Sequence, residues 1–297
     1  MAKYARLRER LDGHQDLTPA SFVIPEPASW DALARVHGRD YLAALKTGDL
    51  PRDIERRIGF PYSPQMVERS RRSVGGTLAA AAAARRGGVA VNLAGGTHHA
   101  FADTGAGYCV LNDVVVAARQ QQADAALGQV LVVDLDVHQG DGTAALCAGD
   151  SAIVTFSMHG ERNYPTRKQV SDLDVPLPDG CGDTDYLAAL QQHLPALLAT
   201  HQPELVFFLA GADPFEGDRL GRLALSKAGL QARDRLVFEV LEEAGVPVVV
   251  VMAGGYANDV EDIVDIHAAT VLAAHASWRR RNAGHLDRFG AAASVPR

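Results

Sequence analysis

The chain has 297 residues, of which 47% are hydrophobic and 22% charged, as expected for a globular protein with a full core. Its net charge of −7 tolerates a basic substrate but argues against nucleic acid or an anionic membrane as the main partner. The three cysteines lie far apart without a C-x-x-C pair, which argues against a disulfide framework and a thiolate zinc site. The charged N-terminus lacks a secretory signal and no apolar run could span a bilayer, so a cytoplasmic protein is predicted.

Helical patterns come first along the chain, at residues 2–11, 28–46 and 63–86; the last opens with a serine cap and a proline. Apolar strand-like runs then alternate with helical stretches. The strands are expected at 88–94, 129–136, 151–158, 204–211 and 246–255, and the helices at 112–126, 142–148, 183–200, 226–244 and 259–276. Such alternation predicts an α/β fold of three layers, α/β/α, with a mostly parallel central sheet.

No linker or internal repeat divides the chain, so a single domain over residues 1–297 is predicted, with a frayed tail at 285–297. The unusual polar residues follow the predicted strands. The segments are NLAGGTHHAFADTGAGYCVLND, DLDVHQGDGT, SMHGERNYP, LAGADPFEGDRLG and MAGGYAND. Because ligand sites in open parallel sheets form outside the carboxyl ends of the strands, these five segments are expected to converge.

Three charged or imidazole side chains at spacing two suggest a metal site. Asp134, Asp136 and His138 would point to one face if strand geometry persisted, and mixed carboxylate and imidazole ligands suit Zn²⁺ or Fe²⁺. The alternative is that Asp134 caps a turn and His138 is a solvated loop residue. Asp213, after the run LVFFLAG, is the best candidate for a third ligand, although aspartate is also common in turns. Two carboxylates and one imidazole would leave coordination positions open, as in a catalytic site.

The adjacent histidines His98 and His99 share one strand-end loop. Such pairs are more often incidental, but a histidine oriented by a carboxylate has a defined tautomer and can act as an acid or base, and Asp134 and Asp141 are available for this. Tyr256, after two glycines, is either a turn-flanking aromatic or a donor to a developing oxyanion. Two further loop aromatics would either line a slot for an extended apolar substrate arm or pack the loops: Tyr108 and Tyr164.

Together these segments resemble the histone deacetylase family of the arginase/deacetylase fold. GGTHHA, GYCVLND, DLDVHQGDGT, SMH, GAD and GGY follow the family's order within residues 59–272, the motif-bearing core. The stretch GADPFEGDRLGRLALSKAGLQARD is most similar to the class IV branch, and bacterial deacetylases of the family also look similar.

The resemblance implies a role for each matched residue. The zinc ligands would be Asp136, His138 and Asp213. The catalytic group would comprise His98 backed by Asp134, His99 backed by Asp141, and Tyr256, which would polarise the amide carbonyl. The acyl-lysine channel would be lined by Gly107, Tyr108 and Tyr164. A structural potassium ion would bind backbone oxygens around Asp134, Asp136, His138 and Ser157.

The sequence departs from the family pattern in two places. The family normally begins with a strand before the first helix, whereas this sequence starts almost inside that helix. Either the start is assigned too late or the edge strand is absent, and a missing edge strand would affect solubility and activity. The family also commonly carries an arginine near the base of the channel, for which Lys3 is the nearest counterpart.

The resulting hypothesis is a zinc-dependent hydrolase of N-acyl-lysine amides that uses a metal-activated water, a histidine acid/base and a tyrosine. The substrate could instead be an acetylpolyamine or another small acylated amine, since all would need the same core. Two further alternatives are a ureohydrolase with two manganese ions, for which DLDVH offers few carboxylates, and a non-catalytic binder of acylated ligands. Oligomeric state and acyl-chain preference have no signal in the sequence.

Overall fold

The computed structural model describes residues 2–125 and 127–283, and the predicted tail at 285–297 lies outside them. Six strands of the described chain form one sheet in the order β1-β6-β5-β2-β3-β4, and every neighbouring pair is parallel. The strands are β1 (Val89–Asn92), β2 (Val130–Asp134), β3 (Ile153–Gly160), β4 (Leu173–Leu177), β5 (Leu205–Leu209) and β6 (Val248–Val251). The predicted α/β fold with a parallel sheet is confirmed.

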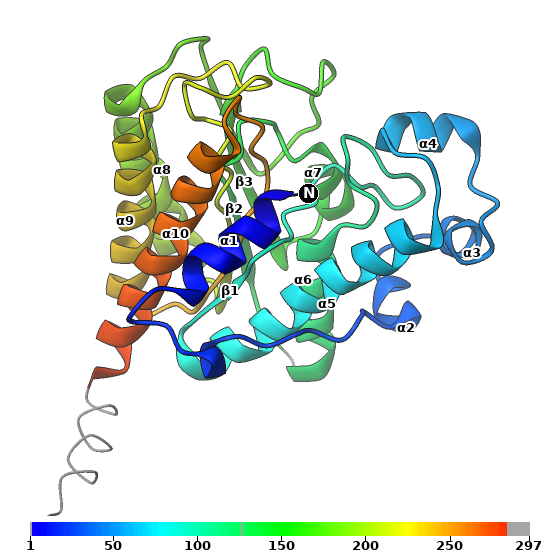
Figure 1. Ribbon diagram of the computed structural model, residues 1–297, viewed down its shortest axis with the longest axis horizontal. Coiled ribbons are helices and arrows are strands. Elements are labelled where there is room, and N and C mark those ends of the chain that lie inside the picture. The colour runs from blue at the N-terminus through cyan, green and yellow to red at the C-terminus, as the bar shows by residue number, and fades with distance from the viewer. Residues whose placement is uncertain (1, 126, 284–297) are drawn as a thin grey trace, which may run out of the picture.

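Helices cover both faces of this sheet (Figure 1). They are α1 (Ala2–Asp12), α2 (Trp30–Leu33), α3 (Arg39–Thr47), α4 (Arg52–Ile58), α5 (Pro64–Gly87), α6 (Asp113–Ala125), α7 (Asp141–Cys147), α8 (Asp183–His201), α9 (Lys227–Glu243) and α10 (Val260–Arg281), with a 3₁₀ turn at Pro19–Ser21. Among the described residues no helix is long and apolar enough to cross a membrane.

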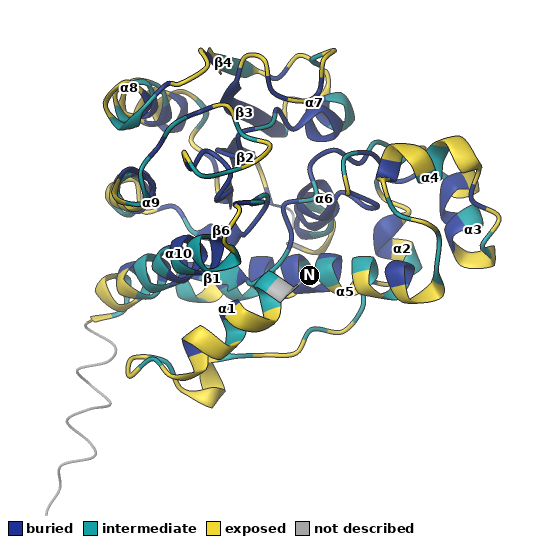
Figure 2. Ribbon diagram, turned by 45° about the horizontal axis from the view of Figure 1, so that its top comes forward, coloured by how far each residue is buried: buried dark blue, intermediate teal, exposed yellow. Residues whose placement is uncertain are grey.

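Strands β2, β3, β5 and β6 are fully buried because their residues alternate between two cores. In β2, Leu131 and Val133 join the core made with α8, α9 and α10, whereas Val130 and Val132 join the core made with α5 and α6. The central strands are accordingly buried, while the outer surfaces of the helices are exposed (Figure 2). This explains why the strand sequences are continuously apolar rather than alternating.

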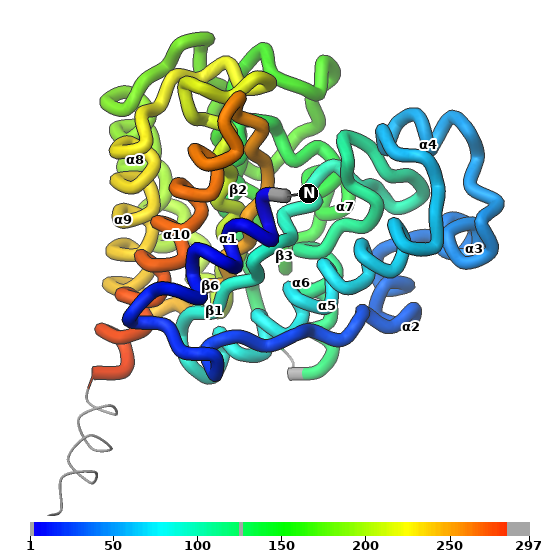
Figure 3. The backbone as a smooth tube through the Cα atoms, in the orientation of Figure 1, coloured from blue at the N-terminus to red at the C-terminus, as the bar shows by residue number. Residues whose placement is uncertain are grey.

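Helix α5 begins where the sequence predicts, since Ser63 Oγ accepts a hydrogen bond from Met66 N (3.1 Å) ahead of proline at the first position. The glycine in the middle of this helix serves close packing. A Cβ on Gly75 would lie 1.8 Å from the carbonyl oxygen of Glu26, so glycine is needed where the N-terminal segment crosses the helix. The N-terminal helix α1 itself packs along α10 (Figure 3).

The helix predicted over 28–46 is wrong as one continuous element, because the chain breaks into α2 and α3. The break is held by tertiary contacts of His37 and Gly38. His37 Nδ1 donates to the Phe101 carbonyl and Nε2 accepts from Asn112 N, both at 3.0 Å. Gly38 N donates to the Ala102 carbonyl (2.9 Å). These bonds tie the α2–α3 turn to a loop of the candidate site.

Two elements were absent from the sequence-based prediction. Helix α4 is short and mostly charged, with only Ile54 and Ile58 apolar, so it has little amphipathic signal. Strand β4 is an edge strand, half-exposed and interrupted by Pro176, which is tolerated there because an edge strand has one side without strand partners. Within the described residues the chain starts with helix α1 and not with a strand. Strand β1 forms the edge of the sheet opposite β4.

The order of the strands creates a crevice at the centre of the sheet. After β2 the chain adds β3 and β4 on one side, and it then returns to add β5 and β6 on the other. Strands β2 and β5 are therefore neighbours at the point where the direction of winding reverses. In parallel α/β sheets such a switch point is where ligands bind, and the DLDVHQGDGT and GAD segments follow these two strands.

Candidate metal centre and active site

The three predicted metal ligands converge at this switch point. Ligand atoms of Asp136, His138 and Asp213 all lie within 4.8 Å of one another. His138 Nδ1 is 3.0 Å from Asp136 Oδ1 and 3.2 Å from Asp213 Oδ2. Strand geometry does not persist through this segment, because β2 ends at Asp134 and the chain bends at residues 136–138. Asp136 and His138 meet through that bend, while Asp134 is directed to a histidine instead.

Backbone amides fix the orientation of both carboxylates. Gly254 N donates to Asp136 Oδ2 (2.7 Å) and Val137 N donates to Asp213 Oδ1 (3.0 Å). A Cβ on Gly254 would lie 1.9 Å from Asp213 Oδ2, and one on Gly211 would lie 2.7 Å from Asp213 Oδ1. The site is therefore cradled by two glycines that leave the carboxylate oxygens uncovered. Neither glycine was singled out as a site residue from the sequence.

The electrostatics of this cluster call for a cation. Asp213 is fully buried, and no described residue donates a hydrogen bond to its Oδ2 even though His138 Nδ1 lies nearby. Burial, and then the charge of Asp136, raise the pKa of Asp213. Burial opposes a charge on His138, but the nearby carboxylates of Asp136 and Asp213 raise its pKa to about 10. Two buried oxygen ligands and one nitrogen ligand are a donor set that fits Zn²⁺ or Fe²⁺.

Each of the adjacent histidines is paired with its own carboxylate. His98 Nδ1 lies 2.7 Å from Asp134 Oδ2, and His99 Nδ1 lies 2.6 Å from Asp141 Oδ1. The two rings are 4.2 Å apart between centroids, and all four side chains are buried. A carboxylate only accepts hydrogen bonds, so Nδ1 carries the proton in each ring, and Nε2 of a neutral ring is an acceptor.

The two imidazoles differ in proton affinity although they are neighbours. For His98, burial favours the neutral form, but the charges of Asp134 and Asp136 outweigh it and raise the pKa to about 9. For His99, burial and then the positive charge of His98 lower the pKa to about 4, against the opposing effect of Asp141. The pair therefore holds one charged and one neutral ring side by side.

A buried arginine contacts the segments that carry the candidate metal ligands. Arg233, on α9, is fully buried, and its Nη1 donates to the carbonyl oxygen of Gly211 at 2.6 Å and to that of Leu135 at 3.4 Å. Its charge is balanced by Asp234, whose Oδ1 accepts from Nε at 2.8 Å. The guanidinium thus joins the two segments that carry the carboxylate ligands. The sequence feature that could have identified Arg233 is its place as a charged residue on the apolar stripe of α9, between Leu230 and Val237.

Gly107, Tyr108 and Tyr164 lie on loops close to the histidines or to Tyr256. The ring of Tyr164 meets the His99 ring edge-on with 4.9 Å between centroids, and the Tyr108 ring lies 5.7 Å from that of Tyr256. Gly107 has φ of +50°, and a Cβ there would lie 2.6 Å from His99 Cδ2. Tyr108 and Tyr164 are about half exposed, at 47% and 45%. The structure thus places Gly107 and Tyr164 against His99, and Tyr108 beside Tyr256.

Tyr256 is held through its backbone. Its amide donates to Asp218 Oδ2 (2.6 Å), and its carbonyl accepts from Arg219 Nε (3.0 Å). Lys3 approaches the same loop, with Nζ 3.4 Å from the carbonyl oxygens of both Ala253 and Gly255. Burial raises the pKa of the Tyr256 phenol, so the hydroxyl stays protonated and able to donate.

Comparison with known proteins places the chain in a family. The family described as the histone deacetylase domain matches residues 1–271. The chain belongs to the histone deacetylase family. An Arabidopsis thaliana protein named Histone deacetylase 2 is 31% identical over 264 residues, which cover 86% of this chain and 68% of that protein. An uncharacterized protein of Picosynechococcus sp. is 48% identical over 268 residues, covering 90% of this chain and 89% of that protein.

Solved structures agree on the fold of this histone deacetylase family member. The crystal structure of a histone deacetylase homolog from Aquifex aeolicus superposes with a TM-score of 0.77 at 23% identity, covering 95% of this chain and 77% of that chain. A structure of a homolog complexed with SAHA gives the same values. The family resemblance predicted from the motifs is therefore confirmed.

Proposed function

We propose that this protein is a zinc-dependent deacylase that hydrolyses the amide of an N-acyl-lysine to a free amine and a carboxylate. The observation that carries the proposal is the convergence, at the β2–β5 crevice, of a three-residue metal cluster with two imidazoles, each paired with its own carboxylate. Membership of the histone deacetylase family supports the same chemistry. The less favoured version of this proposal has an acetylpolyamine or another small acylated amine as substrate.

The zinc ion would be held by Asp136, His138 and Asp213, whose donor atoms face one another. When bound, zinc would supply Lewis-acid polarisation of the amide carbonyl and lower the pKa of the attacking water. The proposal includes a structural potassium ion on backbone oxygens around the β2 end and Ser157. The parallel register that pairs Asp134 with Ser157 supports this, because it brings the two backbone segments side by side.

The proton transfers are assigned to His99. Its Nδ1–H bond to Asp141 leaves Nε2 as the free acceptor, which suits it to take the proton of the attacking water and then deliver it to the leaving lysine amine. His98, anchored by Asp134 in the same way, would act mainly through its charge. Each proton gained by His99 is returned in the same cycle, so the histidine is regenerated.

Tyr256 is assigned to stabilise the carbonyl oxygen as it becomes negative. Its backbone bonds to Asp218 and Arg219 would keep the phenol fixed, so little reorganisation accompanies the reaction. The acyl-lysine arm would reach the centre between Tyr108 and Tyr164, past Gly107. Their rings offer apolar walls to the methylene chain, which has no hydrogen-bonding groups of its own.

The proposal is tested with zinc-loaded wild-type protein and a Tyr256→Phe variant. Their hydrolysis is measured on a panel of peptides that carry acetyl-lysine or longer acyl-lysines, and on acetylpolyamines. We expect kcat to fall by about 10²–10³ with unchanged zinc content, because one oxyanion donor is removed while the ligands stay intact. Tyr62→Phe, outside the site, is the matched control. Full activity of Tyr256→Phe would refute the role of the phenol. Absence of amide hydrolysis by the wild-type protein across the panel would refute the function.

A further inference from the structure

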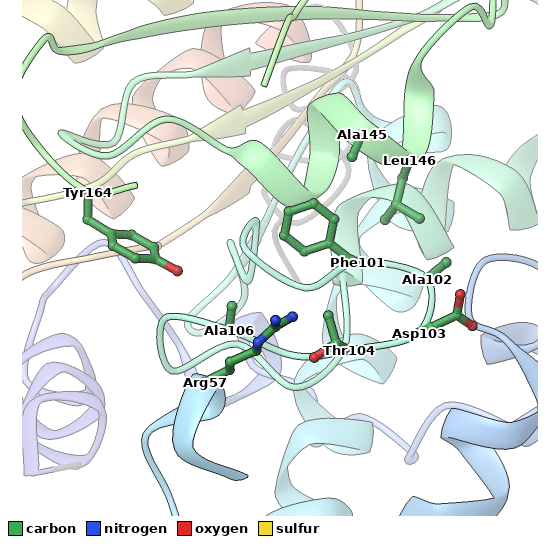
Figure 4. Close-up of a pocket in the computed structure, with 9 residues that line it drawn as sticks. All are labelled: Arg57, Phe101, Ala102, Asp103, Thr104, Ala106, Ala145, Leu146 and Tyr164. Atoms are coloured by element: carbon green, nitrogen blue, oxygen red, sulfur yellow. The ribbon is translucent and has the colours of Figure 1, made fainter. Parts of the chain in front are cut away.

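A cavity of about 490 Å³ opens beside the mouth of the proposed acyl-lysine channel. Figure 4 shows its lining residues, which come from the end of α4, the loop after His99, helix α7 and the loop that carries Tyr164. Tyr164 belongs both to the mouth of the proposed channel and to the cavity, since its ring contacts the His99 ring and also lines the cavity. A group bound in this cavity would therefore lie next to whatever enters the channel.

The walls of the cavity combine apolar surface with one cationic side chain. Phe101, Ala106 and Leu146 supply carbon surface, and Arg57 extends from the end of α4 toward Phe101 (Figure 4). In the described part of the chain no carboxylate forms an ion pair with Arg57. The acidic residue of the lining, Asp103, is directed toward the α2–α3 turn, since a Cβ on Gly38 would lie 1.9 Å from its Oδ1.

Arg57 is held at this place by its backbone. Its carbonyl oxygen accepts a hydrogen bond from Gly107 N (3.0 Å), which links the end of α4 to the channel wall. A basic residue at a helix C-terminus also interacts favourably with the helix dipole, but Arg56 satisfies that role equally well and does not line the cavity. The specific feature of Arg57 is its position over the cavity.

The neighbouring loop has the same sign of charge. Residues 161–170 carry three basic side chains and one acidic one, in a chain whose net charge is −7. Lys168 is fixed there by hydrogen bonds to the carbonyls of Asn163 and Pro165, at 2.6 and 2.7 Å. The surroundings of the mouth thus favour an anionic group and disfavour a lysine- or arginine-rich segment.

We propose that this cavity is a substrate subsite in which Arg57 binds the carboxylate of an aspartate or glutamate next to the acyl-lysine. The inference rests on the proposed deacylase function and narrows its substrate class to acyl-lysines in acidic sequence. The apolar walls accommodate the methylene carbons of the acidic side chain, and the guanidinium accepts a carboxylate in a two-point contact. A neighbouring lysine would place two positive charges together and weaken binding.

The test compares acetyl-lysine peptides that are identical except at one position next to the acetylated residue. That position carries Glu, Gln or Lys, and it lies before the acetylated residue in one series and after it in another. We expect kcat/KM for the Glu peptide to exceed that for the Gln peptide by about three- to tenfold, mostly through KM, since one partly exposed ion pair is gained. Arg57→Met should bring the ratio of kcat/KM for the Glu and Gln peptides to about one. Arg56→Met, on the same helix, should retain the preference for Glu, and 0.5 M salt should reduce it.

A binding measurement separates this inference from the proposed function. Fluorescence anisotropy of the same peptides on the zinc-loaded Tyr256→Phe variant, with and without Arg57→Met, reports the subsite without turnover. Hydrolysis of all peptides with equal kcat/KM, or a Glu preference that survives Arg57→Met, would overturn the subsite and leave the deacylase function standing. Preferential binding of the Glu peptide through Arg57 without any hydrolysis by the wild type would support the subsite and refute the function. If free N-acetyl-lysine were favoured over every peptide and Arg57→Met lost this preference, the assignment of the cavity to an acidic residue flanking the acyl-lysine would be overturned.

Discussion

The floor and the mouth of the candidate site are built in different ways. On the floor, Asp136 and Asp213 are fully buried, oriented by backbone amides, and supported from below by Arg233. At the mouth, Tyr108 and Tyr164 are half exposed on loops. The floor stands at the ends of two central strands, whereas the mouth is assembled from α4 and loops outside the sheet.

The difference follows from what each region must hold in place. Buried charges are tolerated only when every carboxylate is matched by a donor or a cation, so the floor allows little change of geometry. An exposed rim has water as an alternative partner, so its side chains can vary at small cost in stability. We therefore expect changes on the floor to affect metal binding and folding together, and changes at the mouth to affect substrate choice or local stability.

The largest effect is expected from Asp213→Ala. Removing this proposed ligand leaves Asp136 and His138 as the remaining donors, so zinc measured after dialysis should fall from about one ion per chain to below about a tenth, and hydrolysis should be lost with it. Asp49→Ala, an exposed aspartate on another part of the chain, is the control and should retain zinc. Equal zinc content in both variants would show that Asp213 is not a ligand.

Arg233→Met should weaken the floor from beneath. The change leaves Asp234 buried without its ion-pair partner, so the free energy of unfolding should fall by about 3–5 kcal/mol. Metal affinity should fall by about 10–100-fold, since the carbonyls of Gly211 and Leu135 lose their common donor. Both are measurable on the same protein, by denaturant unfolding and by competition with a zinc chelator.

The double variant Arg233→Met/Asp234→Leu distinguishes positioning from general stability. It removes the buried charge as well as the pair, so it should regain much of the unfolding free energy. Zinc affinity should remain low, because the bonds to the two carbonyls are still absent. If affinity recovered along with stability, Arg233 would have a structural role only.

A smaller effect is expected at the mouth, where His37 anchors the loop that lines the cavity. Burial lowers the pKa of His37 to about 4, and its two hydrogen bonds require the neutral ring. Unfolding restores the ordinary pKa near 6.5, so the stabilisation is complete above that pH and is lost as pH falls toward 4. The loss should be about 3 kcal/mol over this range.

The measurement is the free energy of unfolding between pH 7 and pH 4 for the wild type and for His37→Gln. Glutamine can donate and accept as the neutral ring does, but it does not titrate in this range. The difference in pH dependence between the two proteins gives the contribution of His37 alone, separate from that of all other titrating groups. Identical pH dependence in both would contradict the assignment of His37 as a buried neutral anchor.

Much of the floor could be predicted because its residues follow strands directly. A continuous apolar run identifies a buried strand, and parallel strands end on one side of the sheet, so Asp136, His138 and Asp213 were expected together. Arg233 could not be predicted in its role, because its contacts are to residues 22 and 98 positions away along the chain. The break between α2 and α3 was missed for the same reason: it depends on partners at Phe101 and Asn112.

The sequence by itself determined the fold class and the set of chemical groups, since periodicity, glycine positions and residue types are local properties. The sequence did not reveal the strand order that makes β2 and β5 neighbours, nor the bend after β2 that lets Asp136 and His138 meet while Asp134 contacts His98. It also left open the charge around the mouth, because the net charge of −7 says nothing of which side chains share a surface. Those features were decided by tertiary packing, which brings distant segments within hydrogen-bonding and Coulombic range.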